Sequence, residues 1–180
     1  MTAARAAYAI CLLGYGAWAL VVGHVPSSTL RWFWIVGALG ALALDGVDGR
    51  LARRLGQASA FGARFDMETD AATVLALGIL VWICDQAGPW VLAIGLMRYI
   101  FVGLGWVWPA LAAPLPPKKR RQAICVAQVV ALIVAVVPSL PPALASLLCL
   151  AALVGLVYSF AVDVAWLLAN HAGEKEEAMV

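Results

Sequence analysis

Six long apolar runs divide the chain and limit what it can fold into. They cover roughly residues 6–24, 28–47, 66–84, 89–109, 122–138 and 143–168. Each run is close to the about 20 residues that a helix needs to cross a bilayer, and the breaks between them, such as "HVPSST" and "PSLPP", contain helix-stopping Pro. Only 12% of the residues are charged and the mean hydropathy is +0.94, so the polar surface of a soluble globule is lacking. The sequence therefore predicts an all-α polytopic membrane protein with six transmembrane helices.

The connections between the runs are short, and none resembles a soluble appendage. We therefore expect residues 1–180 to form a single membrane domain, in which residues 170–180 are a short cytoplasmic tail. The first run favours a retained helix over a cleaved signal peptide, because it is long and "VVGH" is a poor cleavage site. The four cysteines have no pair spacing typical of a metal site or a disulfide framework, and we expect them to pack in the bundle or face lipid.

The basic residues indicate how the six helices are oriented. Ten of the 12 fall on the side of the membrane that carries both termini, Arg31 falls on the other side, and Arg98 lies within the fourth run. The positive-inside rule then predicts that both termini are cytoplasmic. At 1.5 Å per residue, Asp45 lies about 21 Å below Arg31, which is still within the hydrocarbon region. Carboxylates at that depth are costly, and they favour a functional site.

Five of the ten acidic residues lie in one stretch of 26 residues, "DGVDGRLARRLGQASAFGARFDMETD". On helices, Asp45 and Asp48 would share one face, and Asp66 and Asp70 would share another. Four converging carboxylates repel one another unless cations join them, and an oxygen-only ligand set favours Mg²⁺ or Mn²⁺. Glu68 lies on the opposite side of its helix and is not predicted as a ligand. The stretch therefore predicts a site for two divalent metals.

Other residues of the same stretch suit a phosphate-containing ligand. Gly49 and Gly62 lack side chains where a ligand can approach the backbone, and Arg53 offers a fork of donors to phosphate. Taken alone, "DGVD" is more often a loop or a cap, and the arginines are more often a topogenic signal. Metal-binding carboxylates, an arginine and bare backbone are together the parts that hold a diphosphate and stabilise its transfer.

The motif D-x2-D-G-x2-A-R-x8-G-x3-D-x3-D runs through this stretch. Its fixed positions are Asp45, Asp48, Gly49, Ala52, Arg53, Gly62, Asp66 and Asp70. The motif resembles the signature of the class I CDP-alcohol phosphatidyltransferase family, membrane enzymes that build phospholipid headgroup linkages, and within it phosphatidylglycerophosphate synthases. The motif covers about a seventh of the chain, while the six predicted spans and cytoplasmic termini also suit the family.

The resemblance implies a role for each motif residue. Two divalent metals, Mg²⁺ or alternatively Mn²⁺, would be bound by Asp45, Asp48, Asp66 and Asp70. The nucleotide of the donor would be bound by Gly49, Ala52, Arg53, Ser59 and Gly62. Asp70 would also be the general base, taking a proton from the acceptor hydroxyl, whose oxygen attacks the β-phosphorus and expels CMP.

The resemblance also implies the partners. The donor would be a CDP-alcohol, CDP-diacylglycerol in the first place, and the protein would be a homodimer in a bacterial inner membrane with its site facing the cytoplasm. No nucleic-acid partner is expected. Glycerol 3-phosphate is the favoured acceptor. Inositol phosphate or another polyol stays open, because the chain has "AAYAICLLGY" instead of the opening "PN-x-LT-x-x-R" of many glycerophosphate-using members.

Charged residues outside the motif leave alternatives open. Lys118, Lys119, Arg120 and Arg121 could attract a phosphorylated polyol or could anchor the fifth span as positive-inside residues. Arg98 needs a partner within the membrane, and Asp163 in the sixth run is the candidate. An ion-coupled transporter or an intramembrane prenyltransferase could use similar carboxylates, but both acidic pairs lie within 26 residues here, and no inverted second copy of the pattern is present.

Overall fold

The structure is a computed structural model that describes residues 2–55, 60–108 and 119–177. Side chains 2, 45–55, 60, 61, 63, 119 and 168–177 lie outside this description. The helices are α1 Thr2–Val22, α2 Ser28–Leu55, α3 Ala60–Ile83, the 3₁₀ turn η1 Pro89–Val91, α4 Leu92–Val107, α5 Lys119–Ala135 and α6 Pro142–Glu177. Six α-helices and no strand occur in these ranges, which confirms the predicted all-α fold.

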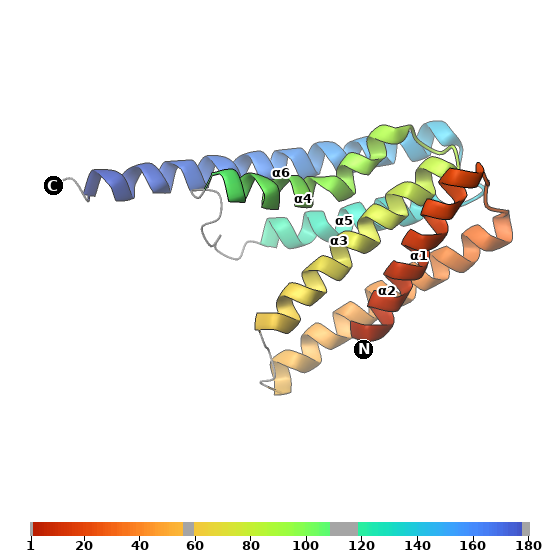
Figure 1. Cartoon of the computed structure of the whole chain (residues 1–180), viewed down its shortest axis with the longest axis horizontal. Helices are drawn as coiled ribbons and strands as arrows, with labels where there is room; N and C mark the ends of the chain where they lie inside the picture. The colour runs from red at the N-terminus through yellow and green to blue at the C-terminus, as the bar shows by residue number, and fades with distance from the viewer. Residues whose placement is uncertain (1, 56–59, 109–118, 178–180) are drawn as a thin grey trace.

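Successive helices run back and forth along the bundle, as Figure 1 shows. The connections after α1, α3 and α5 lie together at one end, whereas the starts of α1, α3 and α5 point away from that end. The central element is α3, which packs against α1, α4 and α5, while α5 packs along α6. The beginning of α3 is therefore placed where side chains from several helices can reach it.

The core of the bundle forms around the middle of α3. Leu77, Leu80 and Val81 are fully buried there, together with Leu12 of α1 and Leu132 of α5. In lipid, helices gain little from hiding apolar surface and associate through close packing, which small residues allow. At Gly95 of α4, an added Cβ would lie 2.5 Å from the Leu75 Cα, so α3 and α4 touch through backbone atoms at this point.

Two left-handed residues close helices at the same end of the bundle. Gly23 follows α1 with φ 70°, and the next amide, His24 N–H, donates to the Ala19 carbonyl. Asp85 follows α3 with φ 57°, and Gln86 N–H donates to the Val81 carbonyl. This pattern is the Schellman cap, in which a left-handed residue turns the chain out of the helix. Both helices therefore end sharply before short connections.

Among the described residues, three helical segments are long and apolar enough to cross a membrane: Ala3–Val22, Pro89–Val107 and Pro142–Leu167. They indicate a membrane protein. A shorter apolar helix covers Ser28–Leu44. The helices of the bundle extend beyond the predicted spans at their charged ends: α2 continues to Leu55, α3 begins at Ala60, and α5 begins at Lys119. These extensions carry the charged residues that lower the hydropathy of α2, α3 and α5.

Candidate active site

The motif residues lie on the end of α2 and the beginning of α3. Asp45 and Asp48 are in the helical part of α2, and Asp66 and Asp70 are in α3, as predicted from their spacing. The side chains of Asp45, Asp48, Ala52 and Arg53 and the surroundings of Gly49 are outside the described residues, and Ser59 is outside them altogether. Gly62 lies in the first turn of α3. The geometry of the candidate site is therefore built from α3 and the helices that face it.

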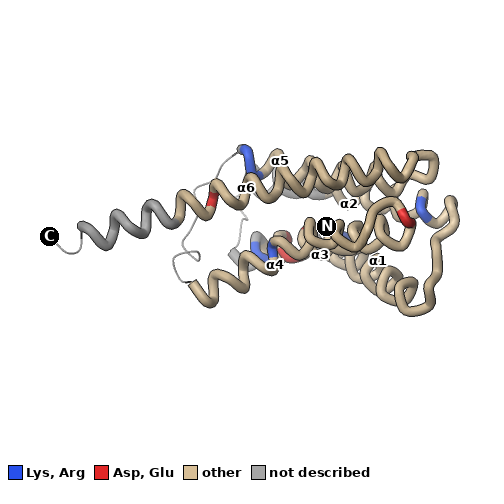
Figure 2. Tube along the Cα trace, turned by 90° about the horizontal axis from the view of Figure 1, so that it is seen from above, with Lys and Arg blue, Asp and Glu red and all other residues tan. Residues whose placement is uncertain are grey.

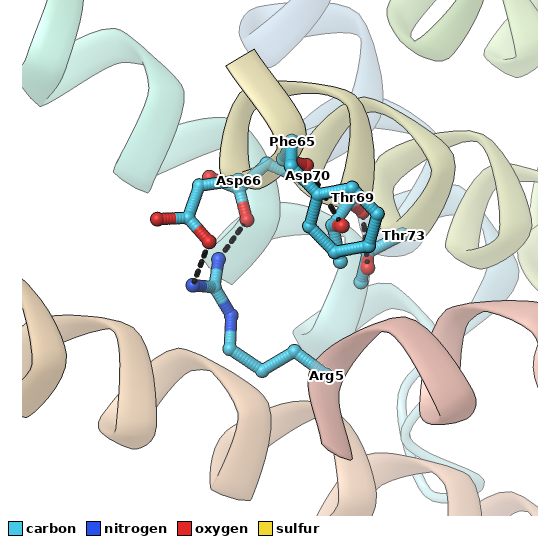
Figure 3. Close-up of polar contacts among 6 residues, drawn as sticks. All are labelled: Arg5, Phe65, Asp66, Thr69, Asp70 and Thr73. Atoms are coloured by element: carbon cyan, nitrogen blue, oxygen red, sulfur yellow. Dashed lines mark hydrogen bonds and ion pairs between the residues drawn. The ribbon is translucent and has the colours of Figure 1, made fainter. Parts of the chain in front are cut away.

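The two carboxylates of α3 share one helix face and meet the same guanidinium. Arg5 of α1, only 3% exposed, pairs with Asp70, and its Nη1 lies 3.6 Å from the Asp66 Oδ1. Figure 3 shows Arg5 reaching across from α1 to both acids. The carboxylates are more accessible than their partner, with side-chain exposures of 40% for Asp66 and 54% for Asp70. A buried cation thus lies beneath two acids that ligands can still reach.

The hydroxyl groups on this part of α3 are satisfied within the helix. Thr69 donates to the Phe65 carbonyl at 2.9 Å and Thr73 donates to the Thr69 carbonyl at 2.8 Å (Figure 3). Such bonds to the preceding turn fix the rotamers of both threonines. The two threonine hydroxyls are therefore occupied within the helix, and Asp66 and Asp70 are the side chains on this face that can accept from or bind a ligand.

A divalent cation fits the donors on this face. The Asp66 and Asp70 side chains are 40% and 54% exposed, so a cation could reach their carboxylates from the side away from Arg5. No group of three or more metal-binding side chains occurs within the described part of the chain. Asp45 and Asp48 would have to complete the set, and the oxygen-only donors would suit Mg²⁺ or Mn²⁺.

The intramembrane arginine has a different partner from the predicted one. Arg98 of α4 donates to Glu68 of α3 at 2.6 Å, so the prediction that Arg98 pairs with Asp163 is wrong. Glu68 therefore faces α4. Spacing along α3 is enough to place Glu68 on a different face from Asp66. The ion-pair partner of Arg98 depends instead on how α3, α4 and α6 pack.

Asp163 instead joins α6 to the start of α5. Its carboxylate, with a side chain 7% exposed, accepts from Arg120 at 2.6 Å and lies 3.7 Å from Arg121. Arg120 also donates to the Ser159 carbonyl and lies over the ring of Tyr158. In Figure 2, charged segments of α5 and α6 lie close together at this place. Two members of the predicted basic cluster are thus ion-paired, while Lys118 and the Lys119 side chain lie outside the described residues.

A cavity of about 380 Å³ opens beside Asp70 and extends between the helices. Arg5, Asp70 and Arg98 line it, together with apolar side chains of α2 to α6. Ligand cavities commonly measure about 300–1,000 Å³ and combine apolar walls with a few polar groups. The cavity therefore has the size and lining of a site for a small molecule, with a carboxylate and two arginines on its wall.

Comparison with protein-family models matches CDP-alcohol phosphatidyltransferase over residues 3–167. The chain belongs to this family. The phosphatidyltransferase is thus a transferase of phospholipid biosynthesis that moves a phosphatidyl group from a CDP-alcohol to an alcohol, and its family is known to use divalent metals. A search of solved structures finds no match. The acidic face of α3 and its cavity lie within the matched range.

Sequence reasoning missed two residues at this site of the phosphatidyltransferase. Arg5 is one of the ten basic residues that the positive-inside rule places on the cytoplasmic side, and Thr2 and Arg5 also have the T-x-x-R spacing that ends the family opening quoted above. Gln128 of α5 lines the cavity and is buried. A glutamine in an apolar run was the available signal, but only the packing of α5 against α3 brings it to the cavity.

Proposed function

We propose that the protein transfers the phosphatidyl group of CDP-diacylglycerol to a small alcohol, with glycerol 3-phosphate as the favoured acceptor and CMP as the leaving product. This is the reaction of a phosphatidylglycerophosphate synthase. The observation that carries the proposal is the pair of carboxylates Asp66 and Asp70 on one accessible helix face beside a cavity of about 380 Å³. Inositol phosphate or another polyol is the alternative acceptor.

In the proposed site, Asp45, Asp48, Asp66 and Asp70 hold two divalent cations, Mg²⁺ or alternatively Mn²⁺. When bound, these cations neutralise the charge of the donor diphosphate. The nucleotide contacts are assigned to Gly49, Ala52, Arg53, Ser59 and Gly62. Gly62 and Gly49 leave room for close approach of the ligand, and Arg53 donates to phosphate oxygens.

Asp70 acts as the general base in this proposal. Its carboxylate takes the proton from the acceptor hydroxyl, and the alcohol oxygen then forms a bond to the β-phosphorus. The bond from that phosphorus to the bridging oxygen breaks, and CMP leaves with the electron pair. Arg5 supports this role by position, because its guanidinium pairs with the carboxylate and limits its movement.

Arg98 is a candidate contact for the phosphate of the acceptor. Its side chain lines the cavity, its Nη2 is held by Glu68, and its Nε is buried without a hydrogen-bond acceptor among the described residues. An oxygen of a phosphorylated polyol would satisfy that donor. This arrangement supports a phosphorylated acceptor, which is consistent with the preference for glycerol 3-phosphate.

The proposal includes the setting of the enzyme. Six spans, both termini on the cytoplasmic side and a homodimer in a bacterial inner membrane are consistent with the family and with the distribution of basic residues. Residues 1–180 would act as one membrane domain. The carboxylates would then lie near the cytoplasmic interface, where a water-soluble nucleotide and a membrane-embedded diacylglycerol group can meet.

An acceptor panel tests the proposal. Purified protein with Mg²⁺ and CDP-diacylglycerol is given glycerol 3-phosphate, inositol phosphate, serine or another alcohol, and CMP release is measured. We expect release with one acceptor, and with glycerol 3-phosphate in the first place. No release with any acceptor would contradict the proposed reaction.

Two substitutions test the assigned roles. Asp70→Asn should lower kcat by at least about a hundredfold, as loss of a general base does, while leaving binding of the CDP-lipid mostly intact.

Asp48→Asn should weaken Mg²⁺ binding, measured as the Mg²⁺ concentration that gives half-maximal rate. Asp85→Asn is a matched control, because Asp85 is an exposed carboxylate at the other end of the bundle. Equal and small losses from the first two variants would exclude these roles.

A further inference from the structure

The cavity beside Asp70 contains a buried polar group that the proposed chemistry does not use. Gln128, near the middle of α5, lines the cavity and is 8% exposed. Its Oε1 is buried and accepts no hydrogen bond from the described part of the chain. Beside it, α5 lines the cavity with Val126 and Val129, and toward its start with Cys125 and the exposed Gln122. Gln128 is therefore an amide placed in apolar surroundings with hydrogen-bonding capacity to spare.

Such an amide is costly unless something pairs with it. A buried polar atom without a partner has lost its hydrogen bonds to water and gained none in return. A glutamine side chain offers two N–H donors and one oxygen with two lone pairs, and a single hydroxyl group can accept from the amide and donate to it. Because Gln128 lines the same cavity as Asp70, a molecule in that cavity can offer one hydroxyl to each residue.

The size of the cavity limits which molecule this is. About 380 Å³ is near the lower end for ligand sites, which suits a small alcohol rather than a diacyl lipid. Arg98 supplies a cation on the wall, and Gln128 supplies a neutral donor and acceptor. The lining thus fits a molecule with an anionic group and more than one hydroxyl.

We propose that Gln128 selects the acceptor, by hydrogen-bonding a second hydroxyl of the alcohol so that the reacting hydroxyl is directed to Asp70. This inference rests on the proposed function and names the substrate class, which is polyhydroxy alcohols that carry a phosphate. An amino alcohol with one hydroxyl leaves Gln128 unpaired. Gln128 is accordingly a specificity residue, while Asp70 performs the chemistry.

The first test removes the second hydroxyl from the acceptor. Glycerol 3-phosphate is compared with 3-hydroxypropyl phosphate, which lacks the 2-hydroxyl, for wild-type protein and for Gln128→Leu. We expect the wild type to prefer glycerol 3-phosphate by at least about tenfold in kcat/KM, as a site built around a hydroxyl does. Gln128→Leu should reduce this preference to less than about threefold and raise the KM for glycerol 3-phosphate, while the KM for CDP-diacylglycerol stays unchanged.

Gln86→Leu is the matched control for this substitution. Gln86 is also buried, at 4% exposure, and its Oε1 also lacks a partner among the described residues, but it lies in the connection after α3 at the other end of the bundle. Its variant should keep the wild-type preference. If Gln128→Leu does not yield folded protein in detergent, Gln128→Asn shortens the amide by one carbon and should show the same loss of preference.

A second test needs no variant and no turnover. Cys125 lies one turn before Gln128 on α5, lines the cavity and is exposed. Glycerol 3-phosphate should slow alkylation of Cys125 by a maleimide, and 3-hydroxypropyl phosphate should require at least about tenfold higher concentration for the same protection. Cys11, exposed on α1 and not part of the cavity lining, is the internal reference in peptide mass spectrometry.

The outcomes separate this inference from the proposed function. CMP release with glycerol 3-phosphate, together with an unchanged preference in Gln128→Leu or equal protection of Cys125 by both phosphates, would overturn the role of Gln128 alone. A stronger response to serine or ethanolamine than to every polyol would overturn the substrate class. No CMP release with any alcohol would overturn the proposed function itself.

Discussion

At the scale of single residues, the site depends on the balance between the positive charge of Arg5 and the negative charges of Asp66 and Asp70. Arg5 is 3% exposed and would be a costly buried cation by itself. Asp66 and Asp70 supply the opposite charge from α3, and in turn the guanidinium reduces the repulsion between the two acids. Because both carboxylates keep substantial exposure, a divalent cation could bind them from the side opposite Arg5.

Substitution of Arg5 should reveal this balance. Arg5→Ala leaves two carboxylates without their buried partner, so we expect a loss of about 1–3 kcal/mol in stability, which is less than for a fully buried pair because the acids are half exposed. The thermal midpoint in detergent, measured with EDTA and with saturating MgCl₂, should fall more in EDTA, since bound cations also neutralise the acids. Arg5→Lys keeps the charge and should lose less. An equal loss with and without Mg²⁺ would show that Arg5 and the cations do not share these carboxylates.

The sequence predicted the acidic face but not its partners. Spacings of three and four residues on a helix put side chains on one face whatever surrounds them, so Asp66 and Asp70 could be paired in advance. Partners come from other helices, and their choice depends on packing that no spacing records. Arg98 therefore binds Glu68 where Asp163 was predicted, and Asp163 binds Arg120 and Arg121.

At the scale of helices, the site depends on how closely α3 and α4 approach. Gly95 allows the contact, since an added Cβ would lie 2.5 Å from the Cα and 2.9 Å from the backbone nitrogen of Leu75. Backbone atoms cannot move aside as a side chain end can. Gly95 also lines the cavity, so a change in this contact alters both the packing and the volume beside Asp70.

Gly95→Ala should therefore destabilise the protein, although alanine is the better helix former. We expect a loss of about 1–3 kcal/mol from overpacking, read as a lower thermal midpoint in detergent, together with lower turnover. Gly103→Ala is the matched control on the same helix, because nothing lies within 4 Å of its added Cβ, and it should be neutral or more stable by up to about 1 kcal/mol. If both variants behaved alike, the close contact at Gly95 would not limit the packing of α3 and α4.

The helices themselves were predictable, and their charged ends were less so. Runs of about 20 apolar residues identify helices because a bilayer demands that length, and all six predicted runs correspond to α-helices. Hydropathy identifies apolar residues and not the helical backbone itself. The predicted span therefore ended at residue 47, whereas α2 continues to Leu55. For the same reason the predicted span began at residue 66, whereas α3 begins at Ala60.

At the scale of the whole molecule, the two ends of the bundle differ in character. One end carries the short connections after α1, α3 and α5, which contain few charges, and the ends of α1 and α3 there have left-handed caps. The other end carries the acidic motif, the start of α5 with its arginines, and the amino terminus (Figures 1 and 2). By the positive-inside rule, the end with more basic residues faces the cytoplasm. We therefore expect the nucleotide and the acceptor to reach the site from the cytoplasm.

Labelling of single cysteines tests that orientation. In a background with Cys11 and Cys125 replaced by serine, Ser27→Cys and Ser139→Cys place exposed thiols on the short connections, and Ala3→Cys places one beside the amino terminus. A membrane-impermeant maleimide added to intact cells that express the protein should label positions 27 and 139 at once, and position 3 only after permeabilisation. The reverse pattern would put the carboxylates on the outer side and would contradict the predicted orientation.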